Sequence, residues 1–232
     1  MLDTKLIYIE GLPGSGKSTA ASWLAKRLQS ADREASLFLE HQPGHPLNVG
    51  GDNHPAGDTP GDVFFQHYNP ENFIQESLER WQRFLGAAIQ EDTIHILDSY
   101  PYQNSVRVLL QLNADLECIT AYTAQVEALA APLKPALVYF SQTDSEYAIR
   151  RFTQISEQRG KEWTEYVVDL VMRCPYAQAR NLTGFEGILV FLREYHQLVT
   201  SLLKDSQFPR IILENCSDGW DGCYQRIEDF IG

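Results

Sequence analysis

Residues 5–19 read KLIYIEGLPGSGKST, and this stretch decides the fold. Its second half, GLPGSGKS at 11–18, matches the pattern G-x-x-x-x-G-K-[ST] of a phosphate-binding loop, or P-loop. An apolar run precedes the loop, and a helical segment from Ser18 to about Ser30 follows it. That order of strand, loop and helix is the context that a P-loop requires. An ordinary glycine-rich turn is the alternative, but such a turn has no need of Lys17 followed by two hydroxyls.

The chemistry of the individual positions explains the pattern. Gly11 and Gly16 permit backbone conformations that other residues rarely adopt. The N–H groups of the loop then converge on phosphate oxygens, and the helix that follows adds the positive end of its dipole. Lys17 would place its ammonium on the β- and γ-phosphates, and the Ser18 hydroxyl would bind Mg²⁺. The residues expected to bind nucleotide are Gly11, Pro13, Gly14, Ser15, Gly16, Lys17, Ser18 and Thr19.

Five short apolar runs alternate with helical material along the chain. They span Lys5–Glu10, Ala35–Glu40, Thr93–Asp98, Ala136–Ser141 and Arg210–Glu214. Most of them are almost uninterrupted by polar residues, as expected of strands that are buried on both faces. The alternation predicts a doubly wound α/β fold with a parallel sheet.

Several helix boundaries can be predicted from local signals. Asn69 followed by Pro70 indicates a helix start. The segment 143–146 has the spacing of a capping box. An amphipathic pattern from residue 185 to 202 predicts a long helix near the end of the chain, and a final helix is expected after Asp218.

Carboxylates end three of the predicted strands. Open parallel sheets bind ligands beyond the carboxyl ends of their strands, so Glu10, Glu40 and Asp98 are expected at the edge that holds the active site. Asp98 lies beside the P-loop and is a candidate ligand of Mg²⁺, directly or through water. Glu40 or His41 would accept a proton from an acceptor hydroxyl or hold it by hydrogen bonds. The alternatives are a turn former or helix cap at Asp98 and solvated strand ends at the others.

Arginines follow the fourth predicted strand at helical spacing. Phosphoryl transfer needs cations where negative charge spreads over the γ-phosphoryl oxygens. Arg150 and Arg151 are suited to this, and Arg159 could assist them. A solvated basic helix face is the alternative. The catalytic candidates are therefore Lys17, Glu40, Asp98, Arg150 and Arg151, and the candidate metal ligands are Ser18 and Asp98.

A segment rich in Gly, Pro, Asn, Asp and His follows the second predicted strand, at 41–62. We expect a substrate loop over about 41–68, because loops of this length are usually functional. Four histidines lie there among carboxylates, namely His41, His45, His54 and His67. A metal site is an alternative to a polar substrate loop, but the spacings match no structural metal pattern.

The composition of the 232 residues excludes several classes of protein. A net charge of −12 and a pI of about 4.9 disfavour nucleic-acid binding, which usually needs a basic stripe. No apolar run approaches the length of a membrane span. The four cysteines lack C-x-x-C spacing, so we expect reduced thiols and a cytoplasmic protein, with disulfides or a zinc site as the alternative. The chain is expected to form one domain over 1–232. Its oligomeric state, monomer or homodimer, stays open.

The sequence resembles the P-loop nucleoside and nucleotide kinase superfamily, and thymidylate kinase in particular. IEGLPGSGKST at 9–19 is similar to the P-loop of that family with its preceding Glu. EHQPGHP at 40–46 resembles the loop after the second strand, and DSYPYQNS at 98–105 resembles the Asp-Arg-Tyr segment. The last 21 residues, ILENCSDGWDGCYQRIEDFIG, are similar to the final strand and helix, whose loop cradles the adenine. The chain looks closer still to a bacterial thymidylate-kinase-like group with a His-Pro segment after the second strand. The resemblance implies strand order 2-3-1-4-5, a helical lid within about 145–183, and ATP or GTP with Mg²⁺.

The acceptor region departs from this family. Ser99 stands where the family has the arginine that binds the acceptor phosphate. Between Arg33 and Arg80 there is no Lys or Arg, while the same stretch holds eight carboxylates. An acceptor phosphate would need a cation, so we expect a neutral or cationic hydroxyl compound. Arg80, Arg83 and Arg107 lie outside that stretch and could still supply the cation. Aromatic residues of the region could stack on a ring or belong to the core, namely Phe64, Phe65, Tyr68, Tyr100 and Tyr102.

We therefore expect a kinase that transfers the γ-phosphoryl group of ATP to a small-molecule acceptor. That acceptor would be a nucleoside, a nucleotide or a drug-like hydroxyl compound. One alternative is a nucleotide-binding regulatory protein with little or no kinase activity. Another is sulfotransfer from a phosphorylated adenylyl sulfate, which suits Lys17, Ser18 and Asp98 less well than a Mg²⁺-triphosphate does.

Overall fold

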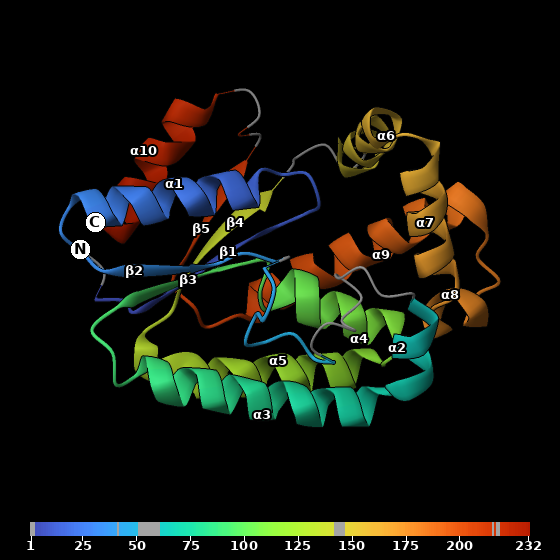
Figure 1. The fold of residues 1–232 in the computed structure, drawn as a ribbon, viewed down its shortest axis with the longest axis horizontal. Helices are drawn as coiled ribbons and strands as arrows, with labels where there is room; N and C mark the ends of the chain where they lie inside the picture. Colours follow the sequence, from blue (N-terminus) through green and yellow to red (C-terminus); the bar gives the residue numbers. More distant parts are fainter. Residues whose placement is uncertain (1–2, 41, 51–60, 142–146, 215, 217–218) are drawn as a thin grey trace.

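The fold is a parallel sheet between two layers of helices (Figure 1). The computed structural model describes residues 3–40, 42–50, 61–141, 147–214, 216 and 219–232. The strands are β1 (Leu6–Gly11), β2 (Ala35–Phe38), β3 (Ile94–Asp98), β4 (Ala136–Ser141) and β5 (Arg210–Glu214). They pair in the order β2-β3-β1-β4-β5, with every pairing parallel. The predicted α/β class and strand order are confirmed.

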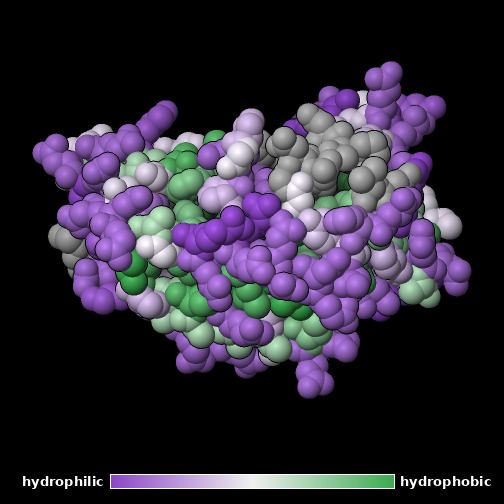
Figure 2. Space-filling view, turned by 60° about the horizontal axis from the view of Figure 1, so that its bottom comes forward, coloured by the Kyte–Doolittle hydropathy of each residue, from purple (hydrophilic) through white to green (hydrophobic). Residues whose placement is uncertain are grey.

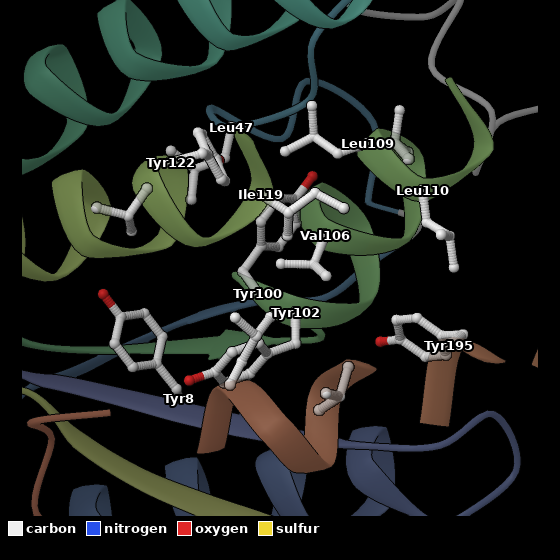
Figure 3. Close-up of a cluster of buried hydrophobic side chains, with 14 of the residues drawn as sticks. Tyr8, Leu47, Tyr100, Tyr102, Val106, Leu109, Leu110, Ile119, Tyr122 and Tyr195 are labelled. Carbon is white, nitrogen blue, oxygen red and sulfur yellow. The ribbon is translucent and has the colours of Figure 1, made fainter. Parts of the chain in front are cut away.

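Two hydrophobic cores hold the sheet. Helices α1 (Lys17–Ser30) and α10 (Trp220–Ile231) cover one face, and α3 (Pro70–Ala88), α5 (Leu116–Ala130) and α9 (Gly184–Asp205) cover the other. The first core includes Ile7, Ile9 and Ile96, whereas the second includes Tyr8 and Leu97. Alternate residues of one strand thus point into different cores, which explains the uninterrupted apolar runs. Figure 3 shows part of the second core, where Tyr8, Tyr102 and Tyr122 lie among aliphatic side chains.

The second strand is shorter than predicted. It ends at Phe38 rather than at Glu40. The Leu39 N–H donates to the Gln42 side chain at 3.2 Å, and the Gln42 N–H donates to the Leu39 carbonyl at 3.0 Å. This local turn uses the backbone groups that a longer strand would have given to β3, so Glu40 lies on the loop that follows.

The predicted helix signals are confirmed where the structure describes them. The Asn69 side chain accepts the Asn72 N–H at 3.0 Å, and the Asn72 side chain accepts the Asn69 N–H at 2.8 Å. This reciprocal cap, with Pro70 at the first position, begins α3. The long helix and the final helix occur as α9 and α10. The segment 143–146 lies outside the described residues.

The region expected to form a lid is helical. It contains α6 (Tyr147–Arg159), α7 (Lys161–Met172) and α8 (Pro175–Ala179), at one end of the molecule in Figure 1. A short helix, α2 (Gly61–His67), ends the described part of the long loop. A π-helical segment, Tyr102–Val106, continues into α4 (Arg107–Gln111) after β3.

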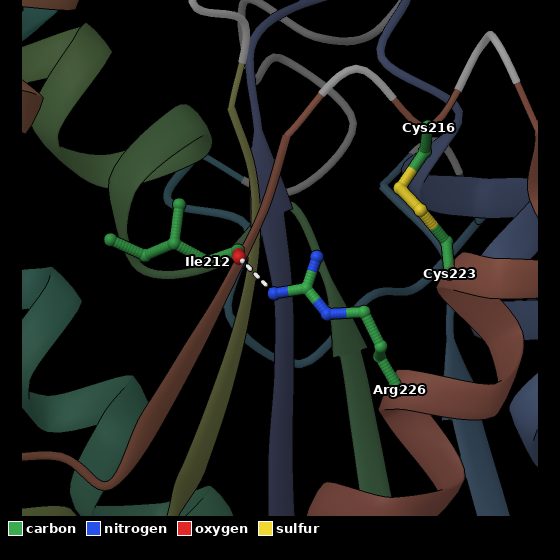
Figure 4. Close-up of a disulfide and its surroundings, with 4 residues drawn as sticks. All are labelled: Ile212, Cys216, Cys223 and Arg226. Atoms are coloured by element: carbon green, nitrogen blue, oxygen red, sulfur yellow. Dashed lines mark hydrogen bonds between the residues drawn. A yellow bond between two sulfur atoms is a disulfide. The ribbon is translucent and has the colours of Figure 1, made fainter.

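The expectation of four reduced thiols is wrong for two of the cysteines. Cys216 and Cys223 form a disulfide, and their Cα atoms are 5.9 Å apart (Figure 4). Cys216 follows β5 and Cys223 lies in the first turn of α10, so the reversal of the chain brings them together. Cys118 and Cys174 are free. A sequence separation of seven residues gave no sign of this turn.

Hydrophilic side chains cover most of the face drawn in Figure 2. Among the described residues, no helix is both long enough and apolar enough to cross a membrane.

Candidate functional site

The P-loop joins β1 to α1, and at Gly14 and Gly16 its backbone adopts a left-handed conformation that favours glycine. Gly14 has φ of 78° and Gly16 has φ of 91°, both left-handed. At both positions there is also no room for a larger side chain. A Cβ on Gly14 would lie 2.9 Å from Cγ of Arg151, and a Cβ on Gly16 would lie 2.2 Å from the Trp220 ring. The loop therefore needs glycine for its backbone and for the side chains packed against it.

Lys17 is the first residue of α1 and is only 5% exposed. Its ammonium donates to the Leu12 carbonyl at 3.1 Å, across the loop. The side chain therefore folds back over the P-loop rather than into solvent. This places a cation at the helix N-terminus, where the helix dipole already favours an anion.

Ser18 and Asp98 meet, as their positions in the sequence predicted. The Ser18 hydroxyl donates to Oδ2 of Asp98 at 2.6 Å, and the Ser99 hydroxyl donates to Oδ1 at 3.1 Å. Asp98 is fully buried at the end of β3. Burial raises the pKa of Asp98, and the nearby Glu40 carboxylate adds to this, while the Ser18 hydrogen bond and the Lys17 charge lower it. A hydroxyl and a carboxylate side by side are hard oxygen donors that fit Mg²⁺.

We expected Glu10 to face the open edge of the sheet, but it does not. It is fully buried, and its Oε1 accepts the Tyr102 N–H at 2.6 Å and the Gln103 N–H at 3.3 Å. Burial raises the pKa of Glu10 to about 8, against the opposing effects of the Lys17 charge and of the two N–H groups. Glu10 therefore holds the start of the π-helical segment in place beside the P-loop, and it is a positioning residue.

The side chain of Gln103 holds Glu40 near the carboxyl ends of the strands. The Gln103 side-chain amide donates to both oxygens of the Glu40 carboxylate at 2.8 Å. The charge of Glu40 also raises the pKa of Asp98, after the larger effect of burial. The structure thus brings the Glu40 carboxylate, on the loop after β2, and the Asp98 carboxylate, at the end of β3, close enough to interact.

The arginines of α6 differ in their placement. Arg151 packs its side chain on Gly14, and its guanidinium donates to Gln154 at 3.4 Å. Arg159 lies over the Trp163 ring, with its guanidinium carbon 5.3 Å from the ring centre. The side chain of Arg150 lies outside the described part. The structure therefore brings Arg151 to the P-loop, while Arg159 engages α7.

The described part of the long loop holds a buried histidine, His45. His45 is 3% exposed and stacks on Tyr100 at 4.6 Å between ring centres. Burial lowers the pKa of His45 to about 4, although the Glu40 charge opposes this. The described residues contain no group of three potential ligands that could hold a metal ion. His41 and His54 lie outside them.

Three of the five aromatic residues proposed for ring stacking belong to the core. Phe64, Tyr100 and Tyr102 are at most 1% exposed. Phe65 and Tyr68 are partly buried and pack against that core. The core interpretation is thus confirmed for the first three.

The arginines outside the acidic stretch have different partners. Arg80 forms an ion pair with Glu76 at 2.8 Å. Arg83 is exposed and donates to the Glu79 carbonyl at 3.4 Å. Arg107 donates to the Gln103 carbonyl at 3.0 Å and to Gln111 Oε1 at 3.2 Å. Among the described residues, Arg107 has neutral hydrogen-bond partners and no carboxylate within ion-pair distance.

Sequence reasoning missed two residues that shape the site. Gln103 orients Glu40, and Trp220 covers Gly16. The only signal was their presence in segments that resemble a kinase, because neither side chain belongs to a recognisable motif. Both contacts join segments that are distant in the sequence.

The sequence matches no family model, and no curated protein matches it. Among solved structures, a herpesvirus thymidine kinase, EHV4-TK in complex with TP5A, gives a TM-score of 0.40. It is 13% identical, over 97% of this chain and 89% of that chain. A GTPase from Pyrococcus abyssi in its apo form gives a TM-score of 0.35 at 14% identity, over 97% of this chain and 98% of that one. Because these scores are low, the assignment of a P-loop NTPase fold depends on the strand order and the loop of this chain.

Proposed function

We propose that this protein is an ATP-dependent phosphotransferase acting on a small-molecule hydroxyl. The observation that carries the proposal is the 2.6 Å contact between Ser18 and Asp98, directly beside the buried Lys17 ammonium. A nucleotide-binding turn without chemistry needs the loop, but it does not need a buried carboxylate paired with the loop hydroxyl. The Ser18–Asp98 pair supports a site for a metal-bound triphosphate, with Mg²⁺ neutralising negative charge on the β- and γ-phosphates when it is bound.

The positions of the side chains support a role for each of them in this reaction. Lys17 would move from the Leu12 carbonyl to the phosphate oxygens. The packing of Arg151 on Gly14 supports a role in which its guanidinium would neutralise charge that develops during transfer. Glu40, held by Gln103, would orient the acceptor hydroxyl and accept its proton.

The charge of the acceptor region supports a neutral or amine-bearing acceptor. Segment 34–79 contains eight carboxylates and no Lys or Arg, and Arg80 is paired with Glu76. A negative potential in a cleft concentrates cations and repels phosphates. Arg107 is the cation that would reverse this preference, because a single arginine–phosphate fork can outweigh several screened carboxylates.

The test is a coupled assay of nucleotide turnover with Mg·ATP or Mg·GTP and three acceptor sets. The sets are nucleoside monophosphates, uncharged nucleosides and aminoglycoside-like amines. We expect turnover to rise at least tenfold with a compound from the second or third set. Fast phosphorylation of a monophosphate alone would contradict the charge argument, and Arg107→Gln should then abolish it. Tight nucleotide binding without turnover across all three sets would instead support the regulatory alternative.

A further inference from the structure

Trp220 contacts the P-loop although it lies more than 200 residues away in the sequence. A Cβ placed on Gly16 would come within 2.5 Å of two atoms of the Trp220 six-membered ring, Cη2 and Cζ2. The edge of the indole therefore rests directly on the backbone that precedes Lys17. Gly16 holds a left-handed φ of 91° at this point, so the ring packs on the residue whose conformation shapes the loop.

A series of ring contacts anchors Trp220. Its ring centre is 5.9 Å from that of Phe140 on β4 and 5.6 Å from that of Tyr224. Tyr224 in turn stacks on Trp23 of α1, at 4.2 Å and an interplanar angle of 14°. The start of α10 is thus joined by aromatic packing to β4, which pairs with β1, and to α1, which follows the P-loop. Such contacts contribute to stability beyond the area they bury.

The disulfide brackets Trp220. Cys216 lies four residues before Trp220, and Cys223 lies three residues after it. A second tie joins the same elements, because Arg226 of α10 donates to the Ile212 carbonyl of β5 at 3.1 Å (Figure 4). Trp220 is the first residue of α10 and lies inside the loop that the disulfide closes. Reduction would remove the link between Cys216 and the first turn of α10, while Arg226 and core residues such as Ile227 still hold the rest of the helix.

We propose that Trp220 is a positioning residue for the P-loop and that the Cys216–Cys223 disulfide controls its contact with Gly16, so that the thiol redox state sets the affinity for phosphate groups. This inference rests on the proposed function for its ligand. It concerns the loop that grips phosphate and not the recognition of a base.

The chemical step is thiol–disulfide exchange with a dithiol reductant. A thiolate of the reductant attacks one sulfur and forms a mixed disulfide, and its second thiolate then displaces the other cysteine. The protein gains two electrons and two protons as two thiols, and the reductant becomes a cyclic disulfide. Oxidation by a disulfide of the same class reverses the step.

The experiment measures binding of two probes by calorimetry, Mg·tripolyphosphate and adenosine, before and after treatment with dithiothreitol. We expect reduction to weaken tripolyphosphate binding about tenfold and to leave adenosine binding unchanged. Trp220→Ala should weaken tripolyphosphate binding to a similar extent in the oxidised protein. Trp220→Phe, whose ring lacks the Cη2 and Cζ2 atoms that meet Gly16, should recover only part of the loss. Hydrogen exchange should show faster opening at residues 14–17 in the reduced protein.

Matched cysteine variants separate this effect from general loss of stability. The double variant Cys216→Ser/Cys223→Ser should bind tripolyphosphate as weakly as the reduced protein does, and dithiothreitol should not change its affinity. Cys118→Ser should keep the full redox response, because Cys118 is a free thiol in α5. A lower melting temperature on reduction, with unchanged tripolyphosphate binding and unchanged exchange at 14–17, would overturn the proposal. A loss confined to adenosine would also overturn it, since it would place Trp220 at the base. If the oxidised protein binds neither probe, the proposed function fails, and the exchange measurement alone decides this inference.

Discussion

At the scale of single residues, the site depends on three side chains that α1 and β3 bring close together. Lys17 is buried against the Leu12 carbonyl, and Ser18 is bonded to Asp98. A buried cation and a buried carboxylate are costly unless partners compensate them. Here they lie close enough for the charge on Lys17 to lower the pKa of Asp98, against the larger effect of burial.

Lys17→Ala should remove triphosphate-dependent turnover and leave the fold intact. The side chain makes a single hydrogen bond to the P-loop, so little packing is lost with it. The loss of a cation from the developing charge should lower kcat/KM at least 100-fold, or by about 2.7 kcal/mol. Turnover and circular dichroism are the measurements. An unchanged turnover number would contradict the assignment of the loop.

Asp98→Asn should weaken nucleotide binding in the presence of Mg²⁺ far more than in its absence. The amide oxygen can still accept the Ser18 hydroxyl, so the local geometry is kept while the charge is lost. We expect a loss of about tenfold or more with Mg²⁺, as for other changes at a metal site. Calorimetry with and without Mg²⁺ measures this. Equal losses under both conditions would show that Asp98 is structural.

At the scale of elements, the loop after β2 is built into the molecule by a buried histidine. Nδ1 of His45 accepts the Leu47 N–H at 3.2 Å, and its ring stacks on Tyr100. Tyr100 in turn donates its hydroxyl to Asn48. The part of this loop that the structure describes is therefore packed against the segment after β3, where Gln103 orients Glu40.

The pH dependence of stability should reveal this histidine. Burial lowers the pKa of His45 from 6.5 to about 4, so the unfolded chain takes up a proton between these values that the folded chain does not. The contribution of neutral, buried His45 to the free energy of unfolding is complete above pH 6.5 and is lost as the pH falls towards 4. The free energy of unfolding should drop by about 3 kcal/mol from this residue.

His45→Asn provides the comparison, because its side-chain oxygen can replace Nδ1 as acceptor for Leu47. Urea unfolding of both proteins at pH 7 and pH 4 measures the difference. The variant should lose about 3 kcal/mol less than the natural protein over this range. Parallel losses in the two proteins would mean that His45 does not titrate in this way.

At the scale of the whole molecule, one sheet joins two cores. Ile96 on β3 points into the core under α1 and α10, while Leu97 points into the core under α3, α5 and α9. If one core unfolds, it exposes one face of the sheet, and the other core packs on the opposite face of the same strands. We therefore expect the two cores to unfold together.

Matched substitutions test this cooperativity. Ile96→Val and Ile119→Val each delete one methylene group, the first in the core under α1 and the second in the core under α3. Each should lower the free energy of unfolding by about 0.5–1.5 kcal/mol, and the double variant should show the sum. Circular dichroism and tryptophan fluorescence should follow one shared transition in urea. Separate transitions for the two probes would show that the cores unfold independently.

The sequence by itself determined the presence of the five strands, the start of α3 and the phosphate loop. Local signals were enough for these: the apolar runs of the five strands, the Asn69–Pro70 helix start, and a glycine pattern that has one established use. The contact between Ser18 and Asp98 also followed, because parallel strands end at a common edge.

Only the tertiary structure decided which side chains face the site and which support it. Glu10 and Glu40 both end predicted strands, yet Glu10 is buried under two N–H groups and Glu40 is held by Gln103. The Cys216–Cys223 disulfide and the contact of Trp220 with Gly16 were likewise absent from any local pattern. The physical reason is that burial and pairing depend on segments distant in the sequence. Periodicity and motifs report the preferences of a segment, and they carry no information about the partner that satisfies it.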